Sequence, residues 1–199
     1  MILAELNLRL AALLRARGLL PLRDRRILEV GCGHAYFLNA MHALGAPSRN
    51  LHGTDLLPER IEVARTRYPD MHFRIGNAEV LPYPDRGFDI VMFFTVFTSI
   101  LDPGMRMNIA AEASRVLSSD GSILWYDFRY DNPANPHVRG MGRNEIRTIF
   151  PDYALDLETV TLVPPLARRL GPLTSTLYPL LVRIPFLRTH YLGSLRRRP

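Results

Sequence analysis

A glycine-rich turn between an apolar run and a helical pattern most constrains how this chain can fold. Residues 26–30 are β-rich and apolar, as expected for a strand that is covered on both faces in a parallel sheet. Gly31 and Gly33 follow, and glycine lets the backbone turn tightly and approach a ligand closely. The next apolar residues are at helical spacing and predict a helix whose first N–H groups can bind an anionic group: Phe37, Leu38, Met41 and Leu44.

A second predicted strand, residues 51–55, ends on a carboxylate, Asp55. At this place in dinucleotide folds, a carboxylate accepts hydrogen bonds from the ribose hydroxyls of the ligand. The dinucleotide fingerprint G-x-G-x-x-G would also require a third glycine at position 36, where this chain has Tyr36. The pattern therefore indicates a nucleoside-binding half-fold and disfavours NAD and FAD.

Strand and helix patterns alternate along the rest of the chain. We expect an N-terminal helix with a buried face of Leu3, Leu6, Leu10, Leu13 and Leu14. Further strands are expected at 71–76, 88–94 and 122–128, with helices from residue 57 and from Asp102, and a turn at 118–121. Residues 155–163 and 190–195 are candidates for later strands. Such alternation is typical of a doubly wound α/β sheet, whose ligand lies beyond the carboxyl ends of the strands.

The glycine turn resembles motif I of the class I S-adenosylmethionine-dependent methyltransferases. That motif reads roughly E/D-x-G-x-G-x-G/A, and its matches here are Glu29, Gly31, Gly33 and Ala35. Residues 76–84 and 88–91 resemble the segment G-D-A-x-x-L-P-F-x-D…F-D-V-V of small-molecule methyltransferases, especially the ubiquinone and menaquinone C-methyltransferases. Residues 115–121 resemble the turn R-V-L-K-P-G-G. The resemblance covers roughly residues 26–130.

The resemblance implies a fold and a cofactor. The fold is a mainly parallel, seven-stranded Rossmann-like sheet with an antiparallel last strand and helices on both faces, and the cofactor is S-adenosylmethionine. Glu29 would reach the amino group of the cofactor, and Asn77 and Ala78 the adenine ring, although Asn77 stands where the family usually has Asp. The full set of expected cofactor-binding residues is Glu29, Gly31, Cys32, Gly33, His34, Asp55, Leu56, Asn77, Ala78 and Phe94.

A general base leaves a weaker trace, because methyl transfer needs mainly that the acceptor and the methyl group are held in line. A polar, proline-punctuated loop follows the strand at 122–128, at the ligand end of the sheet. His137 is the first candidate for the base and Asp127 the second. The alternative for His137 is an exposed loop histidine without a catalytic role.

The composition fits one globular domain of 199 residues, with an N-terminal helix at 1–25, a cofactor-binding core at 26–130 and a substrate side at 131–199. The only cysteine is Cys32 and the histidines are scattered, so we expect no disulfide and no metal. Charged residues interrupt the apolar N-terminus, which favours a cytoplasmic protein over a secreted one. Residues 164–188 are rich in leucine and arginine, and either cap an apolar substrate, touch a membrane surface or only pack on the sheet.

These observations predict methyl transfer from S-adenosylmethionine to a small, apolar molecule, with an oxygen of a hydroxyl or carboxyl group as the favoured acceptor. A quinone-like or otherwise activated carbon is the first alternative. The N/D-P-P-Y/F tetrapeptide of methyltransferases that act on the amino groups of DNA bases is absent, and we expect no nucleic-acid partner. Methylation of RNA or protein, and cofactor binding without catalysis, remain as further alternatives.

Overall fold

Seven strands form a single sheet in the order β3-β2-β1-β4-β5-β7-β6. The computed structural model describes residues 2–131, 135–163 and 180–198. The first five strands in this order are parallel to one another, whereas β7 is antiparallel to both β5 and β6. This arrangement confirms the expected fold class. The strands are β1 Ile27–Val30, β2 Leu51–Asp55, β3 His72–Ile75, β4 Phe88–Phe94, β5 Leu117–Phe128, β6 Tyr153–Leu162 and β7 Arg188–Arg197.

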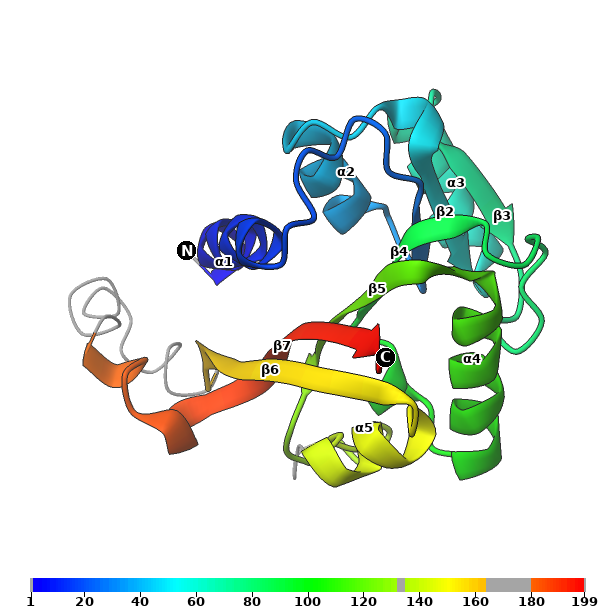
Figure 1. Ribbon diagram of the computed structural model, residues 1–199. Helices are drawn as coiled ribbons and strands as arrows, with labels where there is room; N and C mark the ends of the chain where they lie inside the picture. The colour runs from blue at the N-terminus through cyan, green and yellow to red at the C-terminus, as the bar shows by residue number, and fades with distance from the viewer. Residues whose placement is uncertain (1, 132–134, 164–179, 199) are drawn as a thin grey trace.

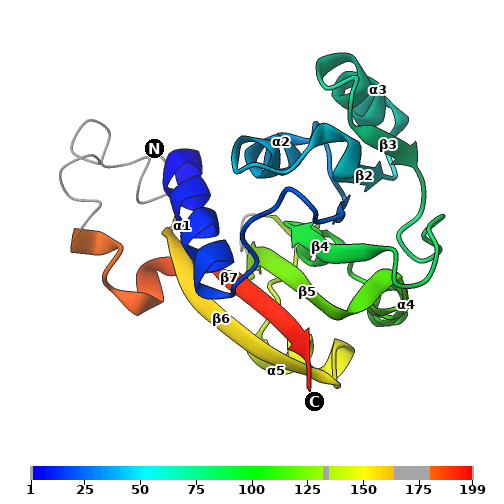
Figure 2. The same cartoon turned by 45° about the horizontal axis from the view of Figure 1, so that its top comes forward.

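Helices cover both faces of the sheet (Figures 1 and 2). One face carries α1 (Ile2–Ala16), α2 (Tyr36–Ala43) and α3 (Pro58–Arg67), and the other carries α4 (Pro103–Val116) and α5 (Arg143–Ile149). The expected apolar face of α1 is buried at Leu6, Leu10, Leu13 and Leu14, but Leu3 in its first turn is 51% exposed.

The apolar strand β4 supplies both halves of the core. Ile90, Met92 and Phe94 pack in the cluster beneath α1, α2 and α3, whereas Val91 and Phe93 pack in the cluster beneath α4 and α5. This period of two is the pleat of a strand that is buried on both faces, as the sequence predicts. The residues that follow β4 are therefore delivered to the carboxyl edge of the sheet.

The structure differs from the expected elements in the second half of the chain. The turn predicted at 118–121 is wrong, because β5 already pairs with β4 at Leu117. Leu117 lies opposite Phe88 and Ser122 opposite Ile90, so residues 118–121 bulge out where β4 has a single residue. The helix α5 was not predicted. It begins after Gly142, whose N–H donates to Glu145 Oε2 at 3.1 Å, a side-chain cap that the apolar pattern does not reveal.

Part of the predicted substrate cap, residues 164–179, lies outside the described residues. The described remainder includes a short 3-10 helix at Pro185–Leu187, and it exposes Leu180 and Phe186. Across the described ranges, no helix has both the length and the apolar character that a membrane crossing requires.

Candidate cofactor site

A cavity of about 620 Å³ opens beyond the carboxyl ends of β1, β2 and β4, between these strands and α4. A volume of this size is in the range of sites that bind drug-sized ligands. Its wall combines a polar end near β1 and β2 with an apolar end near α4. The lining residues are Val30, Gly31, Thr54, Asp55, Leu56, Leu57, Arg60, Gly76, Asn77, Ala78, Thr95, Val96, Ser99, Ile100, Leu101, Asp102, Met105 and Ile109.

Gly31 forms the floor of the polar end, where only glycine fits. Its φ is +71°, in the left-handed region that L side chains rarely adopt. A Cβ built on Gly31 would also lie 2.7 Å from Val96 Cγ2. The turn is fixed to β2, because the N–H groups of Gly31 and Cys32 both donate to Thr54 O, at 2.8 and 3.0 Å. The glycine requirement predicted from the sequence therefore has two separate physical causes.

Asp55 is the buried carboxylate of the cavity wall. It is 5% exposed, and its two oxygens accept hydrogen bonds from the backbone: Oδ2 from Gly33 N at 2.9 Å and Oδ1 from Leu57 N at 3.0 Å. The Arg60 guanidinium lies 3.9 Å from Oδ2. A carboxylate has about four lone-pair sites, so Asp55 keeps capacity to accept two more hydrogen bonds. A pair of vicinal hydroxyls would use that capacity.

The apolar end of the cavity is built by α4 and the segment before it. Asp102 caps the helix, because its Oδ1 accepts a hydrogen bond from Met105 N at 2.7 Å, and Pro103 occupies the first turn. Met105 and Ile109 of this helix face the cavity together with Ile100 and Leu101. The sequence does not distinguish this wall from a core-facing helix, because an apolar helical stripe has the same pattern whether it faces the core or a ligand.

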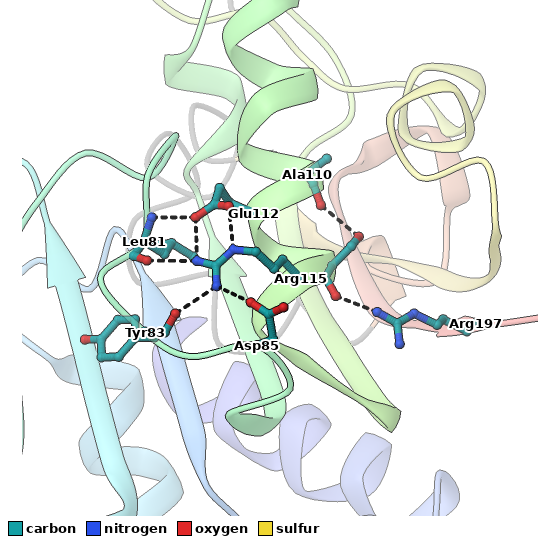
Figure 3. A network of polar contacts seen from close by, with 8 residues as sticks. Leu81, Tyr83, Asp85, Ala110, Glu112, Arg115 and Arg197 are labelled. Carbon is teal, nitrogen blue, oxygen red and sulfur yellow. Dashed lines mark hydrogen bonds and ion pairs between the residues drawn. The ribbon is translucent and has the colours of Figure 1, made fainter.

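The loop that carries Asn77 and Ala78 is fastened to α4 by Arg115 (Figure 3). The Arg115 guanidinium donates to three acceptors of this loop: Leu81 O at 2.9 Å, Tyr83 O at 2.8 Å and Asp85 Oδ1 at 2.7 Å. It also forms two bonds with Glu112, whose Oε2 accepts Leu81 N at 2.7 Å. The hydrogen bonds with Arg115 lower the pKa of the Glu112 carboxyl. The network holds one wall of the cavity in place.

Thr95 lies at the cavity wall in an unusual backbone conformation. Its φ is +59°, which is rare for a β-branched residue. The conformation is held by Thr95 N donating to Tyr126 O at 2.7 Å and by Thr95 Oγ1 donating to Phe94 O at 2.7 Å. Strained residues of this kind concentrate at functional sites. The sequence does not reveal this backbone conformation, because a threonine at the end of a strand is ordinary.

The structure brings part of the predicted cofactor set to this cavity: Gly31, Asp55, Leu56, Asn77 and Ala78. Gly33 reaches it only indirectly, through its hydrogen bond with Asp55. Asn77 is exposed, and its amide group bonds to Glu79, with its Oδ1 accepting Glu79 N at 2.9 Å and its Nδ2 donating to Glu79 Oε2 at 3.1 Å.

The other predicted cofactor residues lie away from the cavity wall. The Cys32 thiol is buried against β2 and its pKa is raised by that burial, while His34 is exposed on the turn. The Phe94 side chain lies on the face of the sheet that α1, α2 and α3 cover, and the centroid of its ring is 4.4 Å from that of the Phe37 ring. Glu29 is 1% exposed, and burial raises the pKa of its carboxyl. Their roles in cofactor binding stay predictions.

The two predicted catalytic residues, Asp127 and His137, differ in burial and in hydrogen bonding. Asp127 is fully buried, and its carboxylate accepts hydrogen bonds from Thr98 Oγ1 at 2.6 Å, Phe128 N at 2.9 Å and Thr98 N at 3.2 Å. It therefore ties β5 to the short helix Phe97–Ser99, which follows β4. His137 is exposed on the loop after β5, and its backbone N–H donates to Asn135 Oδ1 at 3.0 Å. Neither residue is part of the cavity wall.

The burial of Asp127 is expected to make the stability of the folded protein depend on pH. Burial raises its pKa to about 6, against about 3.9 in an unfolded chain. Because the folded pKa is the higher one, the stabilisation that protonated Asp127 contributes is complete below pH ~4 and is lost as the pH rises to ~6. Between these values we expect the stability of the wild type relative to Asp127→Asn to fall by on the order of 2 kcal/mol.

Urea unfolding of both proteins at pH 4, 5, 6 and 7 measures this change. The exposed Asp120→Asn, on the same strand, is the control for removing one charge. A difference between wild type and Asp127→Asn that is constant from pH 4 to 7 would contradict the prediction.

The comparisons with known proteins agree with this geometry. A family model described as a methyltransferase domain matches residues 27–121. Among solved structures, a S-adenosylmethionine-dependent methyltransferase from Methanosarcina mazei superposes with a TM-score of 0.67 at 17% identity, covering 88% of this chain and 93% of that one. Residues 27–121 therefore match a methyltransferase domain, and the chain has the fold of the class I S-adenosylmethionine-dependent methyltransferases. The matched segment contains the turn, Asp55 and the loop at 76–84, as the resemblance implied.

Sequence relatives with named activities match part of the chain. The demethylmenaquinone methyltransferase of Chlorobaculum parvum is 35% identical over 132 residues, which is 66% of this chain and 52% of the relative. The fatty-acid O-methyltransferase of Mycolicibacterium smegmatis is 35% identical over 113 residues, or 55% of this chain and 40% of the relative. The phthiotriol/phenolphthiotriol dimycocerosates methyltransferase of Mycobacterium leprae is 31% identical over 139 residues, or 63% and 48%. The chain thus spans about half or less of the length of each of these relatives.

S-adenosylmethionine is the cofactor of this family, and the residues present fit it. Thr54 Oγ1, at the cavity wall, and Glu29 Oε2, beneath the turn, are buried and have no hydrogen-bond partner among the described residues. Such groups are costly unless a ligand or water satisfies them. Asp55 has unused acceptor capacity, and the apolar end next to Ala78 offers space for a flat ring. Within the described part of the chain, no group of three or more His, Cys, Asp or Glu could hold a metal ion.

Proposed function

We propose that this methyltransferase transfers a methyl group from S-adenosylmethionine to a small, apolar molecule, with an oxygen atom as the favoured acceptor. The observation that carries the cofactor part is the cavity in which Asp55, the Gly31 turn and the Ala78 loop come together. When bound, S-adenosylmethionine supplies an electrophilic methyl group on a sulfonium. The apolar acceptor is supported by relatives whose names include a fatty acid, a phthiotriol lipid and a menaquinone precursor.

The chain's own residues would act by binding and orientation. Asp55 would accept the ribose hydroxyls, and Val96, Ala78 and the α4 wall would enclose the adenine ring. Glu29 is the buried acid expected to meet the amino group, since its Oε2 lacks a partner in the described residues. Holding the reacting groups in line is the main catalytic contribution that such a site makes.

Two imidazoles are candidates for receiving the acceptor proton. His137 is the residue favoured by the sequence, on an exposed loop next to the carboxyl edge. His190 is the third residue of β7 and pairs with Phe128, the last residue of β5. It stacks on the Tyr126 ring with centroids 4.6 Å apart, and burial lowers its pKa to about 4. Near pH 7 a neutral His190 could accept a proton, but its removal would also disturb the core. The two histidines are therefore to be compared by variant.

The Asp55→Ala variant tests the cofactor part of the proposal. We expect its affinity for S-adenosylmethionine to fall by about 1–3 kcal/mol, or about 5–150-fold, because charge-assisted hydrogen bonds to the ribose are lost. Calorimetric titration measures the affinity, and thermal unfolding checks that the variant folds. Asp55→Asn is the matched control, which keeps one acceptor without the charge and should lose less. Wild-type affinity in Asp55→Ala would exclude the ribose assignment.

The acceptor part is tested with methyl-labelled S-adenosylmethionine. Long-chain fatty acids, hydroquinones with an isoprenoid chain, total RNA and a protein extract are offered separately to the full chain. The proposal predicts label in an apolar small molecule, lost in His137→Ala if that residue is the base. Label in a quinone ring would support carbon methylation instead, and label in RNA or protein the further alternatives. Cofactor binding without transfer to any acceptor would favour a non-catalytic protein. The cytoplasmic location stays a prediction.

A further inference from the structure

A second cavity lies toward the amino ends of β2 and β3, at the opposite end of β2 from Asp55. Its volume is about 570 Å³. His52 near the start of β2 is paired in register with His72, the first residue of β3. The loop after the cofactor-binding residues supplies the outer wall through Pro82, Tyr83 and Pro84. None of the residues that line this cavity lines the cofactor cavity.

The wall of this second cavity is strongly basic. Arg26, Arg65 and Arg74 line it, and no aspartate or glutamate does. Arg65 pairs with Glu62 at 2.7 Å and donates to Phe73 O at 3.0 Å, so its charge is partly used. A group of guanidinium ions around one hollow creates a local positive potential that attracts anions.

Two of these arginines are held by aromatic rings instead of by carboxylates. The guanidinium carbon of Arg26 lies 5.2 Å from the centroid of the Phe88 ring, and that of Arg74 lies 5.3 Å from the Tyr83 ring. Arg74 Nη1 also donates to Pro82 O at 3.2 Å. Neither guanidinium forms an ion pair with any described residue. Asp89 accepts the Arg26 backbone N–H at 2.8 Å and pairs with Arg25 at 3.8 Å.

The two histidines add hydrogen-bond donors to the same wall. Their rings are stacked, with centroids 4.7 Å apart, and His52 also meets the edges of the Tyr83 and Phe88 rings. Burial, the His72 ring and the charges of Arg26 and Arg74 lower the pKa of His52 to about 4. At neutral pH this imidazole is therefore uncharged, and it offers one N–H donor to a ligand.

We propose that this second cavity binds a phosphate-bearing small molecule. Arginine binds a phosphate group through two parallel N–H donors. Two guanidinium ions without carboxylate partners carry a total charge of two, which matches a doubly charged phosphate ligand better than a ligand with a single carboxylate. The cavity volume suits a ligand with one or two phosphate groups and an attached ring or chain. The basic residues surround a hollow and do not follow an extended stripe, which favours a small molecule over a nucleic-acid strand.

Binding of inorganic pyrophosphate and of adenosine diphosphate to the full chain tests this proposal. Calorimetry is done with and without saturating S-adenosylhomocysteine, at a fixed low salt concentration. The proposal predicts binding that S-adenosylhomocysteine does not abolish. In the double variant Arg26→Gln/Arg74→Gln we expect the affinity to fall at least about 10-fold, because charge-assisted hydrogen bonds are lost.

Arg67→Gln is the matched control, since Arg67 is an exposed residue that ends α3 outside the cavity. Its affinity should stay within about twofold of the wild type, because a charge outside the wall contributes only a screened, long-range attraction. An unchanged melting temperature shows that the double variant is folded. The test of this second site is thereby independent of the methyltransferase proposal.

Three results would overturn the proposal. The first is no binding of either probe at millimolar concentration, and the second is an equal loss of affinity in Arg67→Gln. The third is tight binding of an RNA oligonucleotide or of phosphatidate vesicles that the double variant loses, while neither small probe binds. Tighter binding of adenosine diphosphate than of pyrophosphate would support the proposal and show that the attached group also contacts the wall.

Discussion

Gly31→Ala is expected to lose most of its cofactor affinity and to be less stable by about 2–5 kcal/mol. The left-handed backbone alone costs an alanine about 1–2 kcal/mol. The new Cβ would also lie 2.7 Å from Val96 Cγ2, and overpacking of this kind costs about 1–3 kcal/mol more. Since the turn and Val96 are both part of the cavity wall, relief of the clash must move the wall. Urea unfolding and calorimetry with S-adenosylmethionine measure the two losses.

Gly33→Ala is the matched control for the backbone effect. Its φ of +50° is also left-handed, but a Cβ there would meet nothing within 4 Å. We expect a loss of only about 1–2 kcal/mol in stability. Combining Gly31→Ala with Val96→Ala should restore part of the stability, because the opposing methyl group is removed. Equal losses in Gly31→Ala and Gly33→Ala would show that the contact with Val96 has no energetic role.

Arg115→Ala is expected to lower the free energy of unfolding by about 2–4 kcal/mol. The change removes all of the guanidinium bonds that join α4 to the loop at 81–85, and it leaves Glu112 without its cation. The same loop carries the residues expected at the adenine ring, so we expect cofactor affinity to fall as well. Chemical denaturation and calorimetric titration report the two effects.

Arg147→Ala is the control for Arg115→Ala. Arg147 is an exposed arginine of α5 whose side chain, among the residues that the structure describes, donates only to Asn144 Oδ1 of its own helix, at 3.2 Å. Removal of such an exposed contact changes stability by less than about 0.5 kcal/mol. If the Arg115 and Arg147 variants unfold at the same urea concentration, the network of Figure 3 does not hold the cavity wall.

The sequence predicted the cofactor half of the fold well for a physical reason. Strands β1 and β4 are buried on both faces, so their residues are mainly apolar. Gly31 directly after β1 and Asp55 at the end of β2 mark where these strands end. The second half was harder. Between Leu117 and Ser122 the strand β5 bulges, and the polar residues of the bulge have the composition of a turn. The helix α5 is short and depends on a side-chain cap from Glu145.

Some residues of the candidate site could likewise be predicted from the sequence, and others could not. Gly31 and Asp55 were predictable because backbone geometry and hydrogen bonding require those residue types. The α4 wall was not, since Met105 and Ile109 have the pattern of any core-facing helix. The backbone conformation of Thr95 was not predictable, because it depends on a contact with β5 across the sheet. The basic cavity at His52 and Arg74 could not be predicted either, because its residues come from separate elements of the chain.

Equilibrium titration of the full chain with S-adenosylmethionine tests the central claim most directly. NAD and ATP are titrated in parallel, because a general nucleotide cradle would also accept them. Binding of S-adenosylmethionine at one site per chain, with much weaker binding of NAD and ATP, is the result that we predict. A folded chain that fails to bind S-adenosylmethionine, or that binds NAD as tightly, would contradict the assignment of this cavity.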